Sequence, residues 1–414
     1  MTEWRAIAGG GLLDRRAFLT ASLAVPGALS LGAAPTNEPW LSRPGTPPSG
    51  YGNPAPGEGG VARLIHTDYP GIAPGAGVSF TPLHQLRGRL TPNGLHFERH
   101  HAGIPAIGAD QHQLVIHGAV DRPLAFRVED LLRYPMESEL AFLECSGNSL
   151  LLAGDAVPEV PSGVIHGLLS CSEWTGVRLG VLLEEAGIRP DAAWGIAEGG
   201  DAARMNRSIP RAKLLGDALV ALYQNGERLR PEQGYPLRLF LPGWEGNTSI
   251  KWLRRLELRA TPVHSREETS KYSDRMADGS VRQFSFEMGV KSIVTHPSPG
   301  AGLAGPGLYE LSGLAWSGAG RVRRVEVSAD GGASWADAVL EEPNLPRCLV
   351  RFRLPWRWNG APSQIVSRAT DETGAVQPTR DAWRAGYAAG QIYHYNAVGA
   401  WQVHADGRVT NAFV

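Results

Sequence analysis

The chain has 414 residues, of which 43% are hydrophobic and 20% charged, a composition that is ordinary for a globular protein and excludes wholesale disorder. Its formal net charge of -1 and pI near 6.9 provide no broad basic surface, so nucleic acid and anionic membranes are not expected partners. The three cysteines, Cys145, Cys171 and Cys348, are too few for a disulfide scaffold. Because their number is odd, at least one thiol has no partner within the chain.

The N-terminus carries a twin arginine ahead of an apolar segment. Arg15 and Arg16 precede a stretch of small and apolar residues from Leu23 to Ala34. This pattern predicts a Tat export signal over residues 1–34 and a periplasmic protein, although a chance arginine pair on an amphipathic helix is the alternative. The stretch is too short and too rich in glycine for a membrane span. Tat export carries folded proteins, which suits a chain that acquires a cofactor before export.

Two regions of different texture follow a Pro/Gly-rich extension over residues 35–60. Residues 61–262 mix strand and helix patterns, which indicates an α+β domain. A glycine ends the longer of the two helical patterns, and prolines bound the last strand pattern. Strands are predicted over Gln113–Gly118 and Tyr235–Pro242, and helices over Val128–Leu132 and Val177–Gly187.

Residues 263–285 are polar and predict a connector, after which the pattern becomes that of a β-protein. Short segments over residues 286–414 alternate polar and apolar side chains, and Asp330-Gly331-Gly332 is typical of a hairpin turn. Regular short strands with glycine turns predict an all-β, immunoglobulin-like sandwich. The segments that carry this prediction are Gly307–Gly313, Val322–Ser328, Leu349–Leu354 and Ile365–Thr370.

Cys145 is the first residue with chemical interest. It follows an apolar run and precedes Ser146, Gly147 and Asn148, whose small side chains leave room for a bulky group beside the sulfur. A thiolate is a soft donor that suits a soft or high-valent metal centre. A buried structural cysteine, or a disulfide with Cys171, is the alternative interpretation.

Basic residues recur in glycine-containing segments. Phe97–His101 is a cationic cluster that is expected on a loop, and Arg238 and Lys251 are expected at strand ends near Gly243–Gly246. Guanidinium, ammonium and backbone N–H groups together are suited to holding a phosphate. Solvated charge at the ends of strands is the alternative for either residue alone.

Three segments resemble, in order and spacing, the signature segments of the sulfite oxidase family: Cys145–Asn148, Gly234–Arg238 and Ile250–Leu253. Residues 369–378 and Ala400-Trp401 resemble the C-terminal sandwich of the same family. The resemblance runs from about residue 85 to the end. It implies an α+β molybdopterin-binding domain followed by an immunoglobulin-like dimerisation domain, with molybdenum and molybdopterin as cofactor.

The resemblance also implies roles for particular residues. Cys145 matches the thiolate that binds molybdenum, Arg99 the active-site arginine, and Tyr272 the active-site tyrosine, with an exposed linker tyrosine as the alternative. Gln233 stands where the family has a histidine, and its amide can still form hydrogen bonds. The cofactor contacts that the resemblance implies are Phe97, Arg99, His101, Asp201, Gln233, Arg238, Ser249, Ile250 and Lys251.

Two departures favour one branch of the family. Members that oxidise free sulfite clamp the dianion with two further arginines, whose positions match Leu150 and Val403 here. Losing these cations weakens binding of a small doubly charged anion. The sequence therefore resembles the branch that oxidises sulfane sulfur, a persulfide on a cysteine of a carrier protein. No haem-attachment motif is present, so the expected electron acceptor is a c-type cytochrome subunit.

Three other functions compete with this prediction. The nearest is a sulfite:cytochrome c oxidoreductase, and the second is a sulfoxide reductase that runs the chemistry in reverse. The third is a cofactor-free secreted binding protein, which would leave the export signal and the phosphate-binding segments unexplained. The resemblance further implies assembly through the sandwich, as a homodimer or as a heterotetramer with the cytochrome.

Overall fold

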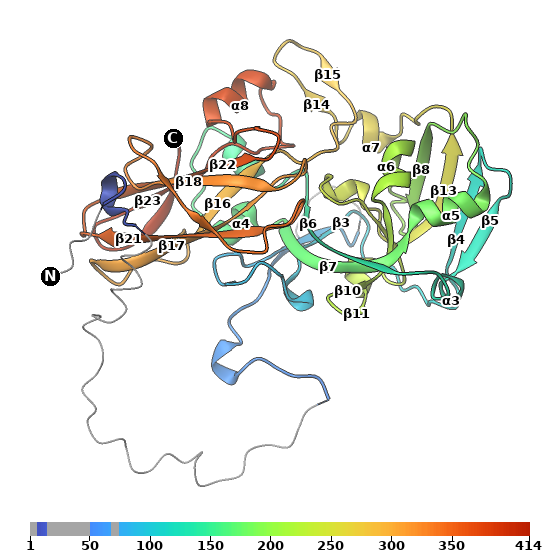
Figure 1. Cartoon of the computed structure of the whole chain (residues 1–414), viewed down its shortest axis with the longest axis horizontal. Coiled ribbons are helices and arrows are strands. Elements are labelled where there is room, and N and C mark those ends of the chain that lie inside the picture. The colour runs from blue at the N-terminus through green and yellow to red at the C-terminus, as the bar shows by residue number, and fades with distance from the viewer. Residues whose placement is uncertain (1–5, 15–49, 68–73) are drawn as a thin grey trace, which may run out of the picture.

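The computed structural model describes residues 6–14, 50–67 and 74–414. The twin arginine and the apolar segment up to Ala34, on which the export signal is predicted, lie outside the described residues, as do residues 35–49 of the extension. A β-sandwich forms one end of the molecule and a mixed sheet with helices forms the other, with a third sheet between them (Figure 1). The predicted fold class, an α+β domain followed by a β-sandwich, is confirmed.

The mixed sheet is ordered β5-β4-β13-β8-β9, with β4 and β13 parallel and the other pairs antiparallel. Leu114 and Ile116 of β4 are fully buried, as the alternating pattern of this segment predicts. The strands are β4 (Gln113–Gly118), β5 (Leu124–Arg127), β8 (Trp194–Gly199), β9 (Asn206–Pro210) and β13 (Leu253–Arg259). The helices of this lobe are α3 (Val128–Leu131), α5 (Leu179–Ala186) and α6 (Arg211–Gly216).

The middle sheet carries the chain toward Cys145. Its order is β11-β10-β7-β6, with β12 paired to β10, and β6 ends at Glu144, directly before Cys145. Val177 and Arg178 belong to β7, so the predicted helix begins two residues later than the pattern indicates. It ends at Ala186 and is capped by Gly187, whose φ is 69°. The strands are β6 (Glu137–Glu144), β7 (Leu169–Arg178), β10 (Leu219–Gln224), β11 (Glu227–Arg228) and β12 (Arg238–Phe240).

A small sheet places the cationic cluster. Strands β1 (Leu64–His66), β2 (Gly77–Phe80) and β3 (Glu98–His100) pair in that order, and Arg99 lies opposite Val78. The expectation of a loop over Phe97–His101 is therefore wrong for its centre, because a strand distant in sequence supplies the partner. Short helices and 3-10 turns join these sheets: η2 (Pro56–Glu58), η3 (Asn93–Leu95), η4 (Leu150–Ala153), α4 (Ser162–His166), η5 (Pro231–Gln233) and η6 (Gly246–Thr248).

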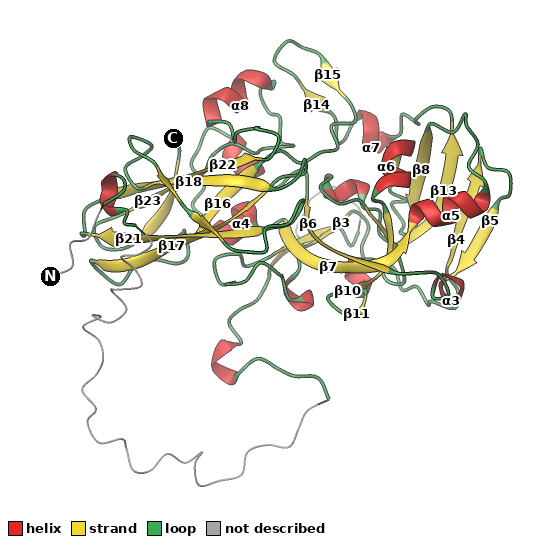
Figure 2. Ribbon diagram, in the orientation of Figure 1, coloured by secondary structure: helices red, strands yellow, loops and turns green. Residues whose placement is uncertain are grey.

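The connector contains helix α7 (Arg266–Thr269) and the hairpin of β14 (Asp274–Arg275) and β15 (Val281–Arg282). The sandwich follows, with sheets ordered β16-β17-β21-β20 and β19-β18-β22-β23-β24 around fully buried tryptophans (Figure 2). Its elements are β16 (Lys291–His296), β17 (Gly307–Trp316), β18 (Val322–Ser328), β19 (Ala336–Asp337), β20 (Val339–Leu340), β21 (Val350–Trp358), β22 (Ser363–Asp371), α8 (Arg380–Gly386), β23 (Ala400–Val403) and β24 (Val409–Ala412).

A short N-terminal segment lies against this sandwich, next to the label of β23 in Figure 1. It contains η1 (Gly9–Gly11) and precedes the twin arginine. Leu12 is fully buried in the sandwich core, and the Trp356 indole N–H donates a hydrogen bond of 2.6 Å to the Gly10 carbonyl oxygen. The first part of the predicted export signal therefore contacts the C-terminal domain.

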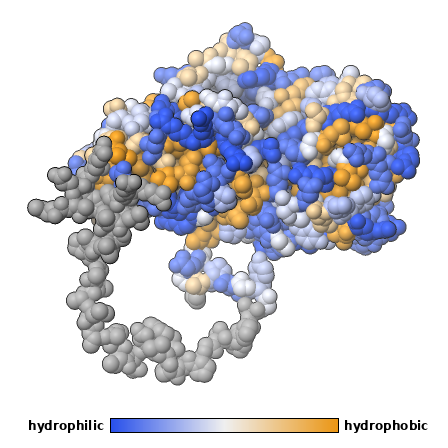
Figure 3. Space-filling view, in the orientation of Figure 1, coloured by the Kyte–Doolittle hydropathy of each residue, from blue (hydrophilic) through white to orange (hydrophobic). Residues whose placement is uncertain are grey.

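Hydrophobic side chains form separate patches among hydrophilic ones on the face drawn in Figure 3. Across residues 6–14, 50–67 and 74–414, no helix is long and apolar enough to cross a membrane.

Candidate active site

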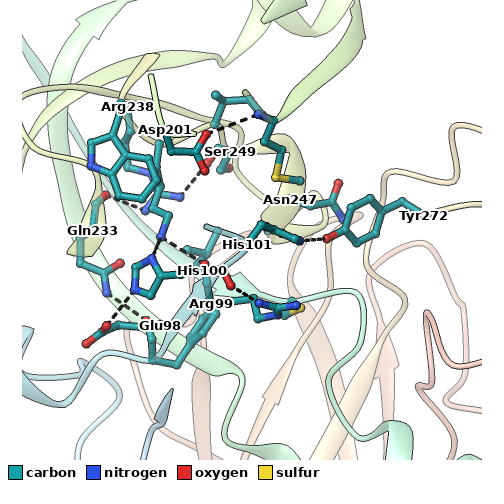
Figure 4. Close-up of a pocket in the computed structure, with 18 residues that line it drawn as sticks. Glu98, Arg99, His100, His101, Asp201, Gln233, Arg238, Asn247, Ser249 and Tyr272 are labelled. Atoms are coloured by element: carbon teal, nitrogen blue, oxygen red, sulfur yellow. Dashed lines mark hydrogen bonds and ion pairs between the residues drawn. The ribbon is translucent and has the colours of Figure 1, made fainter. Parts of the chain in front are cut away.

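A cavity of about 680 Å³ opens where the small sheet, the middle sheet and the connector meet. This volume includes space that is open to solvent. Figure 4 shows Gln233 and Arg238 on one side of the cavity and Tyr272 on the other. All eleven site residues predicted from the sequence line it: Phe97, Arg99, His101, Cys145, Asp201, Gln233, Arg238, Ser249, Ile250, Lys251 and Tyr272.

Cys145 begins the loop after β6 and is only partly buried. Its backbone N–H donates a hydrogen bond of 3.0 Å to the Leu168 carbonyl oxygen, and burial raises the pKa of its thiol. The alternative of a disulfide with Cys171 is wrong, because the Cys171 sulfur lies 3.6 Å from that of Cys348 in the interface between the domains. Cys145 is therefore a thiol that faces the cavity.

Gly246 lets the opposite wall approach the cysteine loop. A Cβ atom at this position would lie 2.9 Å from the Glu144 carbonyl oxygen and 3.6 Å from the Cys145 Cα, so a side chain would force the two loops apart. The following residues, Asn247 and Ser249, line the cavity.

Lys251 is partly buried, and its ammonium group is surrounded by acceptors. Its ammonium group lies 3.2 Å from the Arg99 carbonyl oxygen, 3.1 Å from the Glu232 carbonyl oxygen and 2.9 Å from the His100 Nδ1. Burial, reinforced by the charge of Arg238, lowers the pKa of Lys251 well below its usual value. A nearby anion therefore stabilises the charged form of Lys251.

Arg238 lies beside Lys251, and the two residues together form the cationic floor of the cavity. Its guanidinium donates to the carbonyl oxygens of Gln233 at 3.1 Å and Ser249 at 2.8 Å, while its buried Nε has no hydrogen-bond partner within the described part of the chain. Burial lowers the pKa of Arg238 to about 9. Gln233 in turn donates 2.9 Å to the Phe97 carbonyl oxygen, so the substituted amide keeps a structural contact at this wall.

Tyr272 is not an exposed linker tyrosine, since only 9% of it is accessible. Its hydroxyl lies 2.8 Å from the His101 Nε2 (Figure 4). The Arg207 guanidinium lies 5.4 Å from its ring centre. Burial raises the pKa of Tyr272, so the phenol keeps its proton at neutral pH. Arg207 is itself fully buried against Glu245 at 3.0 Å, which fixes the wall behind the tyrosine.

Several residues near the cavity were not predicted from the sequence. The Tyr393 ring lies 5.3 Å from that of Tyr272, and the Asn247 amide donates 3.1 Å to the Ser146 hydroxyl. The C-terminal match at Val403 does not lie at the site, because Val403 is fully buried in the sandwich core, whereas the C-terminal domain contacts the cysteine loop through the His394 backbone N–H. Leu150, by contrast, lies in η4 beside that loop and is 38% exposed.

Three histidines around the cavity make stability depend on pH. Burial lowers the pKa of His96, His100 and His101 to about 3, assisted at the last two by the charges of Arg99 and Lys251. The folded chain thus keeps them neutral, whereas the unfolded chain protonates them below pH 6.5. Stability from these groups is fully present above that pH and is lost as pH falls toward 3.

We expect His96→Gln to lower the pH slope of the free energy of unfolding between pH 6.5 and 5 by about 1.4 kcal/mol per pH unit, the contribution of one proton. Urea unfolding of cofactor-free protein at several pH values measures it. An unchanged slope in the variant would show that His96 titrates normally in the folded chain.

The cavity fits an anionic, sulfur-linked cofactor. Arg99, Arg238 and Lys251 line it together with two carboxylates, one of which, Glu98, is already ion-paired with Arg63. The unsatisfied Arg238 Nε and the strongly perturbed Lys251 both favour a phosphate group, while the Cys145 thiol suits a soft metal. Fold and site together define a molybdopterin-binding oxidoreductase.

Comparisons with known proteins indicate the same class of enzyme. A model named oxidoreductase molybdopterin binding domain matches residues 101–267, and one named Mo-co oxidoreductase dimerisation domain matches residues 282–400. Sulfite oxidase of Gallus gallus is 33% identical over 315 residues, which cover 70% of this chain and 68% of that protein. NADH nitrate reductase of Ulva prolifera is 28% identical over 72% of this chain and 39% of its own length.

Among solved structures, the crystal structure of the sulfane dehydrogenase SoxCD from Paracoccus pantotrophus superposes with a TM-score of 0.89. It is 44% identical, covering 92% of this chain and 98% of that one. The chain belongs to the sulfite oxidase family of molybdopterin-dependent oxidoreductases, whose cofactor is molybdenum held by molybdopterin.

Proposed function

We propose that this protein oxidises sulfane sulfur, the outer sulfur of a persulfide on a cysteine of a carrier protein. The observation that carries the proposal is the match to the sulfane dehydrogenase SoxCD, at 44% identity over 92% of this chain. Leu150 supports it, because an apolar side chain beside the cysteine loop suits a neutral or singly charged sulfur better than a free dianion.

In this proposal Cys145 is the protein's ligand to molybdenum. When bound, the cofactor supplies oxygen-atom transfer and takes up the electrons, while the protein supplies orientation and charge. The phosphate end is held by the cationic floor of Arg238 and Lys251. The remaining cofactor contacts are Phe97, Arg99, His101, Asp201, Gln233, Ser249 and Ile250.

Arg99 and Tyr272 act on the substrate. The Arg99 guanidinium balances negative charge that develops on oxygen as it joins sulfur. Tyr272 keeps its proton because its pKa is raised by burial, so its O–H can donate to that oxygen. His101, neutral with a pKa of about 3, fixes the phenol through the 2.8 Å contact.

The proposal extends to partners and location. Electrons pass to a c-type cytochrome subunit, and the sandwich, over residues 286–414, mediates a homodimer or a heterotetramer with that cytochrome. Residues 1–34 act as a Tat signal that sends the folded protein to the periplasm. Residues 61–262 form the catalytic domain, and residues 263–285 connect it to the sandwich.

Sulfite oxidation is the second candidate, supported by the 33% identity to a sulfite oxidase. The two functions separate by their specificity constants with a c-type cytochrome as acceptor. We expect kcat/KM for the carrier-bound persulfide to exceed that for free sulfite by at least about 100-fold, a difference of about 2.7 kcal/mol in transition-state binding. The carrier without persulfide is the control, and a preference for sulfite would establish the second candidate instead.

A further inference from the structure

A buried lysine of the sandwich reaches the loop that carries Cys145. Lys291 is the first residue of β16 and is 1% exposed. Its ammonium group donates to the Ser149 hydroxyl at 2.7 Å and to the Tyr395 carbonyl oxygen at 2.8 Å, and lies 3.3 Å from the Glu144 carboxylate. One cation therefore holds the residue before Cys145, a residue four positions after it, and a C-terminal loop.

Glu144 is fixed by more than this ion pair. It is 1% exposed, and it accepts 2.6 Å from the Trp316 indole and 2.9 Å from the Asn148 amide. Two of its partners, Lys291 and Trp316, belong to the sandwich. A buried ion pair repays its desolvation poorly and can often be replaced by apolar residues without loss of stability. Stability alone therefore gives a weak reason for this arrangement.

The conformation of the loop gives a better reason. Ser149 has a φ of 68°, a left-handed conformation that a serine adopts only where its surroundings hold it. Its hydroxyl lies between Lys291 and the His166 Nδ1, the latter at 2.7 Å. Lys291 thus contacts the residue at which the cysteine loop takes its unusual turn.

The third acceptor, Tyr395, belongs to a loop that contacts both the cysteine loop and Tyr272. In the same loop the His394 backbone N–H donates 2.8 Å to the Ser146 carbonyl oxygen, and the Tyr393 ring lies 5.3 Å from Tyr272. The contacts of Lys291 therefore hold this C-terminal loop against the cysteine loop.

We propose that Lys291 is a positioning residue that sets the orientation of the Cys145 sulfur from within the sandwich. The catalytic domain then depends on the second domain for the geometry of its metal ligand, in addition to any role of that domain in assembly. The link to molybdenum rests on the proposed function, whereas the link to the sulfur does not.

Lys291→Met tests this in cofactor-free protein. Loss of the three contacts should favour local opening of the loop and raise the rate of Cys145 alkylation by iodoacetamide at least about tenfold, which corresponds to about 1.4 kcal/mol in the free energy of opening. Peptide mass spectrometry resolves Cys145 from Cys171 and Cys348. Should this variant not fold, Ser149→Ala removes one contact and should raise the rate in the same direction.

Arg351→Met is the matched control. Arg351 is a fully buried cation of the sandwich that also crosses to the catalytic domain, donating 2.7 Å to the Gly88 carbonyl oxygen, but it does not touch the cysteine loop. The Arg351→Met substitution should lower thermal stability and leave the rate of Cys145 alkylation unchanged. Equal acceleration in both variants, or none in Lys291→Met, would overturn the proposal.

A double variant separates position from charge balance. Lys291→Met with Glu144→Gln removes the unpaired carboxylate, so its melting temperature should recover toward wild type while alkylation stays fast. In loaded protein, Lys291→Met should shift the Mo(V) electron paramagnetic resonance signal and lower kcat by about 10- to 100-fold. Faster alkylation in a protein that takes up no molybdenum would refute the proposed function and keep the positioning role.

Discussion

Replacing Cys145 with serine is expected to lower oxidoreductase turnover by at least about 1,000-fold, which corresponds to about 4 kcal/mol of lost transition-state stabilisation. A serine hydroxyl is a hard donor that stays protonated at neutral pH, whereas a metal-bound cysteine is a soft thiolate. The fold should persist, because the side chain is only partly buried and the replacement is nearly isosteric. Cytochrome c reduction, divided by molybdenum content, measures the effect.

Cys348→Ser is the matched control for this experiment. Cys348 is 2% exposed in the apolar cluster between the domains, so a buried hydroxyl should cost about 1–3 kcal/mol of stability. Its turnover per molybdenum should equal that of wild type. Activity retained in Cys145→Ser would refute the role of this residue as metal ligand, and an equal loss in Cys348→Ser would attribute the effect to general damage.

The predictable parts of this fold are those that local pattern determines. The alternation over Val322–Ser328 coincides with β18, and the Asp-Gly-Gly turn after it has φ values of 71° and 93° at Gly331 and Gly332, which favour glycine. The site residues carried by contiguous motifs, such as Cys145 and Lys251, also lie together in one cavity. Their resemblance to the family's signature segments predicted this site, and each lies close to a strand, Cys145 directly after β6 and Lys251 shortly before β13.

Long-range pairing accounts for what the sequence did not reveal. Arg99 lies in a strand only because β2, some twenty residues earlier, pairs with it. The ion pair of Glu144 and Lys291 joins residues 147 positions apart, and neither has a local pattern that marks it as buried. Tyr393 lies in the loop between α8 and β23 and contacts Tyr272 across a long sequence separation, which no local pattern predicts.

The charges of Arg238 and Lys251 link cofactor binding to the stability of the folded protein. Arg238 is buried and Lys251 is partly buried beside it, and burial lowers the pKa of each, so the charged form of each is disfavoured in the cofactor-free protein. Their mutual repulsion costs stability in that state, and an anion offsets it. This pair of cations is thus more favourable in the protein with bound cofactor than in the cofactor-free protein.

Lys251→Met should therefore lower the molybdenum and phosphorus retained per chain by about 10- to 100-fold, since one charge-assisted hydrogen bond contributes about 1.5–3 kcal/mol. The same variant should lose a response that needs no cofactor. Inorganic phosphate at about 100 times its Kd should stabilise cofactor-free wild type by about 2.7 kcal/mol, and stabilise the variant much less. Thermal melting across a phosphate series measures this response.

Lys213→Met provides the control. Lys213 is also a largely buried lysine. Its ammonium group lies 4.9 Å from the Trp244 ring centre, but it pairs with Asp217 away from the cavity. Its loss should lower the melting temperature and leave the phosphate response intact. A Lys251→Met protein that kept both its phosphorus and its phosphate response would move the phosphate site to another part of the cavity. Loss of the response in both variants would attribute it to net charge, because each removes one positive charge from the chain.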